Sequence, residues 1–359
     1  METVKLGLLI KKTKVARCGE YSYPVLSITK QDGIIMQSEK FKKRIASADT
    51  SDYKIIPRGK LVQGIHIDEG NFGIQDIVDN GIVSPAYGVW DINDGLVIPK
   101  YLEMVLRSPK SIEFYRSKLT GTVNRRGHMS DADFLSMDIP LPDRDTQSKI
   151  LKTMKQTTSV LYSRQQQLAK LDELIKARFV EMFGDPYTNS KDYPLKKGES
   201  FFKLSNGKAV PESKRLNGGI PAYGGNGISW YTDESLFDAD TIVVGRVGFQ
   251  SGNVHLVKGP LWVTDNAMYM SSCDFSQYNL TFLIELMAHV DFTKFQDAGD
   301  LKKITQKPFM QFEYLCPPLS LQNQFAAFAA EVDKSKVEVQ KALDQTQLLF
   351  DSLMQQYFG

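Results

Sequence analysis

Cysteine is scarce in this sequence: only Cys18, Cys273 and Cys316 occur among 359 residues, and they lie far apart. An odd number of distant cysteines supports neither a disulfide framework nor a Cys-x-x-Cys metal site. We therefore expect a protein of a reducing compartment, the cytoplasm.

Long hydrophobic runs are also missing. No stretch approaches the roughly 18 apolar residues that a membrane-spanning helix needs, and the N-terminal segment METVKLGLLIKKTK has no signal-peptide core. The formal net charge is only +2, but nucleic-acid binders depend on local basic patches and can be nearly neutral overall. The sequence thus argues against a membrane partner and leaves nucleic acid open.

Catalytic motifs are lacking as well. The sequence contains no GxxxxGK[ST] phosphate loop and no NPPY-type motif of adenine methyltransferases, and the Gly-rich string at 224–227 is not placed between a strand and a helix. The four histidines lie far apart, with no Cys or carboxylate at metal-ligand spacing. Asp300-Leu301-Lys302 fits the end of a nuclease D-x-K motif, but its upstream acid cannot be identified. We expect no catalytic residue, metal site or cofactor in this chain.

What the sequence does contain is a long helix between two breakers. Pro140 and Pro142 precede it, Asp145 and Thr146 are suitable N-cap residues, and Gly184-Asp185-Pro186 ends it. No Gly or Pro interrupts residues 146–183. An apolar stripe at roughly seven-residue spacing predicts a seam for a partner helix, formed by Met154, Leu161, Leu168, Leu171 and Ile175.

The partner helix is predicted at the other end of the chain. A shift of 175 positions lays Pro317 on Pro142, Gln322 on Gln147 and Phe309 on Phe134, so the chain is a tandem repeat. The second stripe consists of Val332, Val339, Leu343, Phe350 and Leu353. Long amphipathic helices often form dimer stalks, but the duplication favours pairing within one chain.

Short β-branched runs between Gly, Asp and Asn turns predict strands in both halves, for example at 59–62 and 240–245. Helices are predicted at 99–108, 111–119 and 278–288 and a strand at 136–139. The fold class is therefore mixed α/β, with two similar domains in tandem joined by two long antiparallel coiled-coil helices and related by a pseudo-two-fold axis. The predicted boundaries are 1–144 and 185–318 for the domains, and 145–184 and 319–359 for the helices.

The proline pair, the glutamine a few residues later, helices ending in EMFGDP and QQYFG, and two dissimilar globular halves resemble the specificity subunit of type I restriction-modification systems. The resemblance extends over the whole chain and includes PAYGGNGI at 221–228 and TDNA at 264–267. It implies a non-catalytic adaptor in which each domain reads one half of an interrupted site in double-stranded DNA. Two modification subunits would dock on the helices, and restriction subunits would join the complex. S-adenosylmethionine, ATP and Mg²⁺ would be used by those partners.

Candidate DNA contacts lie in basic loops, because Arg and Lys bind phosphates while Arg, Asn and Gln read base edges. The loop at 120–127 and the one at 298–304 occupy equivalent places in the repeat. The candidates are Asn124, Arg125 and Arg126 in the first half, and Lys208, Arg246, Lys302 and Lys303 in the second. Two other functions stay open: a coiled-coil scaffold with no DNA role, and a stand-alone DNA-modifying enzyme.

Overall fold

The computed structural model describes residues 2–30, 32–40, 49–119, 129–299 and 302–359. Its chain forms two compact units. Unit 1 combines Met1–Arg164 with Ala342–Gly359, and unit 2 is the continuous segment Gln165–Lys341. Each long helix therefore contributes one part to unit 1 and the other part to unit 2.

Unit 1 is built on a four-stranded antiparallel sheet in the order β2-β9-β6-β7. Two antiparallel hairpin-like pairs, β3–β4 and β5–β8, extend it, and β1 pairs with β10. The strands are β1 (Thr3–Lys5), β2 (Ile10–Lys12), β3 (Leu26–Thr29), β4 (Gly33–Met36), β5 (Lys54–Pro57), β6 (Leu61–Gln63), β7 (Phe72–Ile74), β8 (Asn80–Val83), β9 (Gly88–Ile92) and β10 (Asp138–Pro140).

The helices of unit 1 cover the sheet with apolar side chains. They are α1 (Leu6–Leu9), α2 (Gln37–Lys40), η1 (Ile67–Glu69), α3 (Pro99–Leu106), α4 (Pro109–Lys118) and α5 (Asp131–Leu135). Ser108 and Ser130 cap α4 and α5 by accepting hydrogen bonds from backbone N–H groups of the first turn. The predicted strand at 136–139 begins late, at Asp138, because the amide of Ser136 still bonds to Ala132 O of α5.

Unit 2 has a four-stranded antiparallel sheet in the order β12-β18-β15-β16. Its other sheets are β14-β13-β17 and the pair β11–β19. The strands are β11 (Leu195–Lys197), β12 (Phe202–Asn206), β13 (Ile220–Gly224), β14 (Gly227–Thr232), β15 (Thr241–Gly245), β16 (Val254–Val257), β17 (Trp262–Val263), β18 (Ala267–Cys273) and β19 (Glu313–Leu315). The helices are η2 (Gly198–Ser200), η3 (Glu212–Lys214), α7 (Leu280–His289), η4 (Phe292–Phe295) and α8 (Lys307–Gln311).

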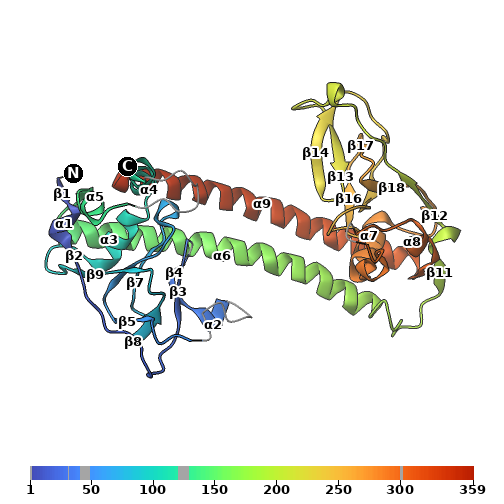
Figure 1. Ribbon diagram of the computed structural model, residues 1–359. Coiled ribbons are helices and arrows are strands. Elements are labelled where there is room, and N and C mark those ends of the chain that lie inside the picture. Colours follow the sequence, from blue (N-terminus) through green and yellow to red (C-terminus); the bar gives the residue numbers. More distant parts are fainter. Residues whose placement is uncertain (1, 31, 41–48, 120–128, 300–301) are drawn as a thin grey trace. The chain divides into compact units, whose positions relative to one another are not determined.

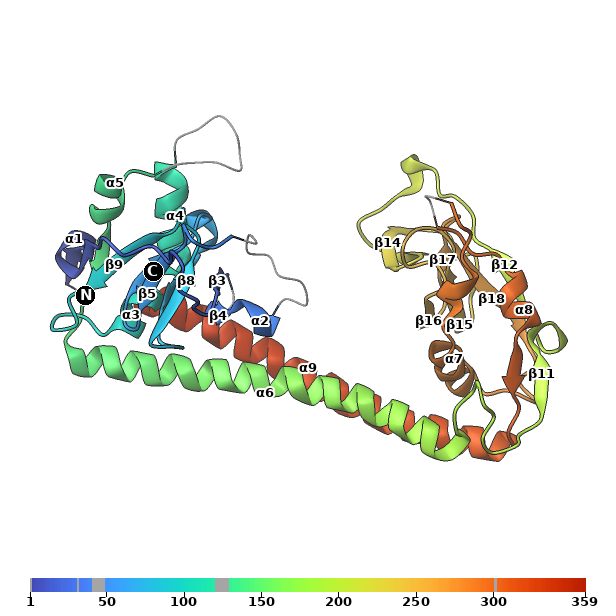
Figure 2. The same cartoon turned by 60° about the horizontal axis from the view of Figure 1, so that its bottom comes forward.

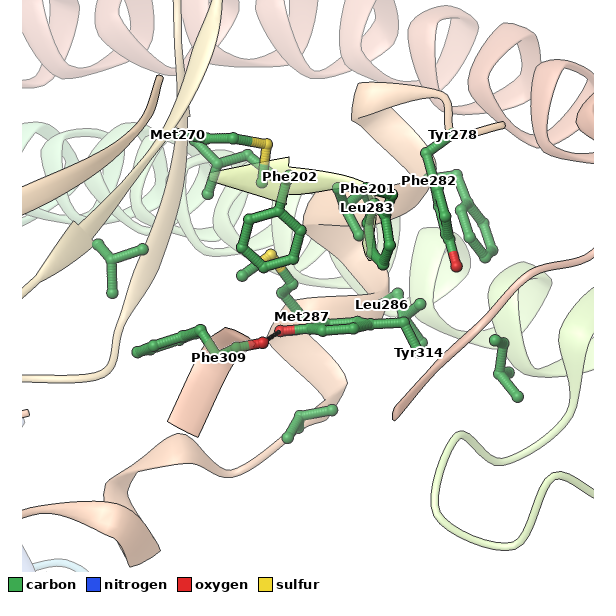
Figure 3. Packing of buried hydrophobic residues seen from close by; sticks show 14 of the residues in the cluster. Phe201, Phe202, Met270, Tyr278, Phe282, Leu283, Leu286, Met287, Phe309 and Tyr314 are labelled. Carbon is green, nitrogen blue, oxygen red and sulfur yellow. Dashed lines mark hydrogen bonds between the residues drawn. The ribbon is translucent and has the colours of Figure 1, made fainter. Parts of the chain in front are cut away.

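The core of unit 2 is rich in aromatic rings (Figure 3). Phe201 stacks on Tyr278 with ring centroids 3.8 Å apart, and Tyr314 donates a hydrogen bond of 3.0 Å to the carbonyl of Phe309. Helix α7 packs against β15 and β16 through the buried Leu283, Leu286 and Met287 (Figure 2). These large side chains bury enough apolar surface for unit 2 to have a core of its own.

The two four-stranded sheets share one chain order. In both, the strands run in sequence as first edge strand, third strand, fourth strand and second strand, and a helix follows the last of them. The predicted match of 240–245 with 60–64 corresponds to β15 and β6, which occupy the same position in the two sheets.

The long helices are α6 (Arg144–Phe183) and α9 (Leu319–Phe358), each of 40 residues. The predicted N-cap of α6 is wrong. Asp143 caps the helix, because its carboxylate accepts hydrogen bonds from the amide and the hydroxyl of Thr146 at 2.9 and 2.7 Å. The helix therefore begins two residues before Thr146.

The end of α9 belongs to unit 1. Phe358 is buried against Tyr101 of α3, with ring centroids 5.7 Å apart, and Lys110 of α4 donates to the carbonyl of Gly359 at 3.0 Å (Figure 1). Phe350 and Leu353 pack on the same core, which also contains Met154 of α6.

In unit 2 the two helices run antiparallel. Phe183 packs on Phe325, with ring centroids 5.7 Å apart, while further along Asp172 forms an ion pair of 2.7 Å with Lys336. Of the ten predicted seam residues, Met154 and Val332 are buried and the others are half-buried: Leu161, Leu168, Leu171, Ile175, Val339, Leu343, Phe350 and Leu353. Phe179 and Phe183, which the stripe does not include, are fully buried.

One buried glutamine fixes the start of each helix. Gln147 accepts a hydrogen bond from the amide of Ile98 at 2.8 Å and donates one to the carbonyl of Pro142 at 2.8 Å. Gln322 accepts from the amide of Asn279 at 2.8 Å and donates to the carbonyl of Pro317 at 2.9 Å. Both side chains are fully buried. The same contact thus joins the helix start to the segment before α3 in unit 1 and before α7 in unit 2.

Candidate nucleic-acid interface

Several strand ends meet at one end of the main sheet of unit 2. The amide of Gly207, just after β12, bonds to the carbonyl of Ala267 at the start of β18 at 3.0 Å. The amide of Arg246, just after β15, bonds to the carbonyl of Asn266 at 2.9 Å. The antiparallel order of β12, β18 and β15 therefore brings Lys208 and Arg246, which are distant in sequence, to the same end of the sheet.

The segment with Lys302 and Lys303 joins this end. Its backbone bonds to the turn after β15 from both sides: Gly248 N donates to Lys302 O at 2.8 Å, and Ile304 N donates to Arg246 O at 3.0 Å. Val247 and Lys303 form an antiparallel bridge. The structure thus places Arg246, Lys302 and Lys303 next to one another.

Lys208 lies on the neighbouring side, toward β17. Its amide bonds to Val263 O at 2.8 Å, and its carbonyl accepts from the indole of Trp262 at 2.8 Å. Lys208 and Lys303 are exposed, and Arg246 and Lys302 are half-buried. Within the described ranges, none of these four cations forms an ion pair with a carboxylate. We call them the unit 2 cation group.

A hollow beside Arg246 adds uncharged groups to the cations. It is lined by Asn206, Arg246, Thr305, Gln306, Lys307 and Met310. The amide of Gln306 donates to Asn206 Oδ1 at 3.3 Å. Because Asn and Gln present a donor and an acceptor side by side, they can pair with base edges in a groove while the cations bind phosphates.

The equivalent end of the unit 1 sheet has its own basic cluster, at the end of β2 and the start of β9. Lys12, Arg17 and Lys54 come from three separate segments. Burial lowers the pKa of Lys54, and the positive charges of Lys12 and Arg17 lower that pKa further. We call these three residues the unit 1 cation group. Lys12 also forms an ion pair with Asp131 and lies 5.6 Å from the ring of Trp90, and Arg17 lies 3.5 Å from Asp52.

A polar hollow adjoins this group as well. Gln63 and Gly64 at the end of β6, Ala86, Tyr87 and Asp131 are among its lining residues, together with Lys12 and Lys54. The indole of Trp90 donates to Gln63 Oε1 at 3.0 Å, which fixes the amide at the mouth of the hollow. Both units therefore combine cations and an amide side chain at corresponding ends of their sheets.

Sequence reasoning missed the unit 1 cation group. Its only signal was the basic string Lys11-Lys12-Thr13-Lys14, and Arg17 and Lys54 carry no pattern of their own. The predicted contacts Asn124, Arg125 and Arg126, and the Asp300-Leu301 part of the D-x-K string, lie outside the described residues.

Chemical groups typical of catalysis were sought in the same structure. The described ranges contain no group of three or more His, Cys, Asp or Glu residues placed to hold a metal ion. Burial raises the pKa of the Cys273 thiol to about 11, which keeps it protonated and unreactive at neutral pH. Over the same ranges, no helix combines the length and the apolar character that crossing a membrane requires.

Comparison with known proteins gives one consistent result. No family model matches the chain. A putative type I restriction enzyme specificity subunit of Haemophilus influenzae is 23% identical over 120 residues, which is 33% of this chain and 31% of that protein. The EcoprrI specificity subunit of Escherichia coli is 23% identical over 113 residues, 32% of this chain and 28% of the relative. The matched stretch therefore spans less than a third of either relative.

Two solved structures extend the likeness to the whole chain. The S subunit of a type I restriction-modification system from M. genitalium has a TM-score of 0.62 at 15% identity and covers 100% of this chain and 96% of its own. A chain from a study of complex assembly and conformational transition of the type I restriction-modification system also has a TM-score of 0.62 at 15% identity, covering 99% and 97%. At this identity the likeness shows the fold alone.

The fold that these structures share with the chain is mixed α/β with a long C-terminal helix. The resemblance predicted from the sequence is confirmed by both comparisons: the curated relatives of this chain are type I restriction enzyme specificity subunits, and its structural neighbours are S subunits of type I restriction-modification systems.

Proposed function

We propose that this chain is the DNA-binding specificity subunit of a type I restriction-modification complex, in which unit 1 and unit 2 each read one half of a bipartite target. The observation that carries this proposal is the repeated placement of cations. Corresponding ends of two sheets with the same strand order carry the unit 1 and the unit 2 cation groups, assembled from separate segments.

This arrangement supports phosphate binding over an ordinary solvated surface. The charges of Lys12 and Arg17 disfavour the charged form of Lys54 in the free protein, so their proximity costs stability. A polyanion would offset that cost, since each phosphate contact also releases counterions from the DNA. Different side chains around similar cation groups would then give the two units different half-sites.

The rest of the complex follows the family resemblance. The tandem recognition domains, their pseudo-two-fold relation and the coiled coil formed by α6 and α9 are part of this proposal. Two modification subunits would dock on exposed polar faces of the helices, and restriction subunits would complete the assembly in the cytoplasm. S-adenosylmethionine, ATP and Mg²⁺ would act in those partners, and this chain would contribute binding without catalysis.

The test uses the full chain expressed with its modification subunit in cells whose DNA is then sequenced for methylated adenine. A bipartite motif that disappears when this chain is omitted supports the proposal. Unchanged methylation without the chain would refute the specificity role, and methyl transfer by the purified chain alone would favour the stand-alone enzyme.

Substitutions in the unit 2 cation group then test its role in the purified complex. Arg246→Ala with Lys303→Ala should weaken binding to all DNA sequences and lower the slope of log affinity against log salt by about 2, one for each phosphate contact. Lys203→Ala is the matched control, because this exposed lysine lies near the opposite end of β12. Equal salt slopes for the double variant and the control would show that the cations do not meet phosphate.

A further inference from the structure

The turn between β15 and β16 displays one aromatic side chain in solvent. Phe249 is 93% exposed, more than any other large apolar residue in the part of the chain that the structure describes. The remaining phenylalanines of unit 2 include many that are fully buried, such as Phe202, Phe282 and Phe309. A side chain this exposed adds nothing to the core and leaves its whole apolar surface in water.

The backbone of this turn is held at both ends. Gly245 donates to Asn253 O at 2.9 Å, and Gly252 donates back to Gly245 O at 2.8 Å. Gly248, which has a φ of +96°, donates to Lys302 O at 2.8 Å. Only glycine adopts such a φ without strain.

The side of the turn opposite Phe249 is anchored in the unit. Ser251 is fully buried, and its carbonyl accepts a hydrogen bond from the amide of Gln296 at 2.7 Å. The turn is therefore fixed by its own hydrogen bonds and by a neighbouring loop, so it presents Phe249 from a defined backbone.

The surroundings of Phe249 indicate what would cover it. Arg246 starts the same turn, and Lys302 and Lys303 form the segment bonded to it, so an apolar ring projects between cations. Duplex DNA offers this combination in reverse: phosphates along the backbone, with thymine methyl groups and base faces between them. A protein partner rich in acidic residues would neutralise the cations but offers no comparable match for a single ring.

Unit 1 has a related turn with different chemistry. The turn from β6 to β7 also starts at a glycine and ends at a Gly-Asn pair, and Gly64 donates to Asn71 O at 2.8 Å. It presents Ile65, which is 56% exposed, and carries the acids Asp68 and Glu69. Both turns thus offer one apolar side chain, while their charges differ.

We propose that Phe249 is a specificity-determining residue of unit 2 that contacts bases directly, between phosphate contacts made by Arg246 and Lys303. This assignment rests on the proposed DNA-binding function. The ring would enter a groove and contact a thymine methyl group, or it would insert at a base step as an apolar wedge.

The experiment uses the full chain in complex with its modification subunit and a duplex carrying the motif that the methylation map defines. Phe249→Ala should lower affinity for this duplex roughly tenfold to a hundredfold, the range expected for losing burial of one aromatic side chain. Its affinity for a duplex of scrambled sequence and its salt slope should match the wild type, because the cations remain. Phe249→Trp should retain most of the affinity.

The matched control is Phe275→Ala. Phe275 is 60% exposed and follows β18 at the opposite end of the same sheet, so its removal should leave both affinities unchanged. Folding can be checked by circular dichroism, which neither substitution should alter.

Two labelled duplexes distinguish the modes of contact. Replacing single thymines of the unit 2 half-site by uracil removes the methyl group, and replacing single adenines by 2-aminopurine reports unstacking as a rise in fluorescence. A loss of affinity at one thymine, or a fluorescence rise that Phe249→Ala abolishes, supports the proposal. In cells, Phe249→Ala should also relax the methylated motif in one half only.

Wild-type affinity and an unchanged motif for Phe249→Ala, in a complex that still recognises its bipartite target, would overturn this assignment and leave the proposed function standing. A wild-type complex that shows no preference for the mapped motif would instead refute the proposed function, and the role of Phe249 with it.

Discussion

At the scale of single residues, Gln147 and Gln322 show how an uncharged polar side chain can organise a core. Each is fully buried, and each joins a proline-containing segment before a long helix to the segment before a shorter one. An apolar residue of similar size would leave the facing amide and carbonyl groups without partners. Such groups are costly when water cannot reach them.

Gln147→Leu should therefore lower the free energy of unfolding of unit 1 by about 3 kcal/mol, since an amide N–H and a carbonyl lose their partners while the volume is roughly kept. Urea unfolding followed by circular dichroism measures this difference. Gln166→Leu is the control, because this glutamine is exposed on the same helix and its substitution should change stability by about 0.5 kcal/mol or less. Equal stability of the two variants would mean that water replaces the lost hydrogen bonds.

The sequence revealed these two glutamines because the duplication repeats them at one spacing from the proline pair. It could not reveal the unit 1 cation group, since Lys12, Arg17 and Lys54 meet only through the pairing of distant strands. The prediction did include Arg246, Lys302 and Lys303, but their proximity depends on hydrogen bonds between backbones that no local pattern encodes. Phe249 had no signal, because exposure is a property of the folded turn.

At the scale of elements, the long helices were predictable and the short strands less so. Proline and glycine mark the ends of α6 well, but the cap at Asp143 lies two residues before the predicted one, at Asp145, because the helix begins directly after it. Phe179 and Phe183 are four residues apart and face the core of unit 2, which a seven-residue stripe aimed at the partner helix does not capture. A helix can thus present one face to a partner helix and another to a domain core.

Helix α7 places a carboxylate where burial and charge oppose each other. Burial raises the pKa of Glu285, and the nearby His289, Lys176 and Lys336 reduce that rise. Because the pKa is higher in the folded state than in the unfolded state, folding favours the protonated form. The contribution of Glu285 to stability is therefore most favourable below about pH 4.5 and is lost as the pH rises through its folded-state pKa.

Glu285→Gln should consequently raise the free energy of unfolding of unit 2 at pH 7, by about 1 kcal/mol, and the gain should shrink toward pH 4. Urea titrations of variant and wild type at both pH values give the difference directly. Glu338→Gln, at an exposed position of α9, should show no comparable gain. If Glu285→Gln were less stable than wild type at pH 7, the attraction of His289 and the lysines would outweigh the cost of burial.

At the scale of the whole molecule, α6 and α9 each run through both units, and unit boundaries fall at Arg164 in one helix and Lys341 in the other. If the helices set the distance between the two half-sites, lengthening both at these boundaries should change only the unread spacer. The antiparallel pairs in unit 2, such as Asp172 with Lys336, indicate that insertions in both helices are needed to keep them in register.

Inserting four helix-forming residues after Arg164 and four after Lys341 adds roughly 6 Å and about 40° of rotation, against about 3.4 Å per base pair of DNA. The methylated motif should keep both half-site sequences, and its spacer should grow by one or two base pairs. Adenine methylation sequencing of cells that express the variant with its modification subunit provides the measurement. An unchanged spacer at full activity would show that the helices do not act as a ruler.

The burial of Phe358 in the core of unit 1 also has a consequence for biosynthesis. Unit 2 is one uninterrupted stretch of chain, whereas unit 1 needs α9 residues from Ala342 onward in addition to its first 164. During translation the unit that is begun first must wait for almost the last codon before its core can close, and the unit that is begun second can finish earlier. Loss of the final helical turns to a premature stop codon would therefore expose the N-terminal half of the protein to proteases, and would leave the half next to the stop intact.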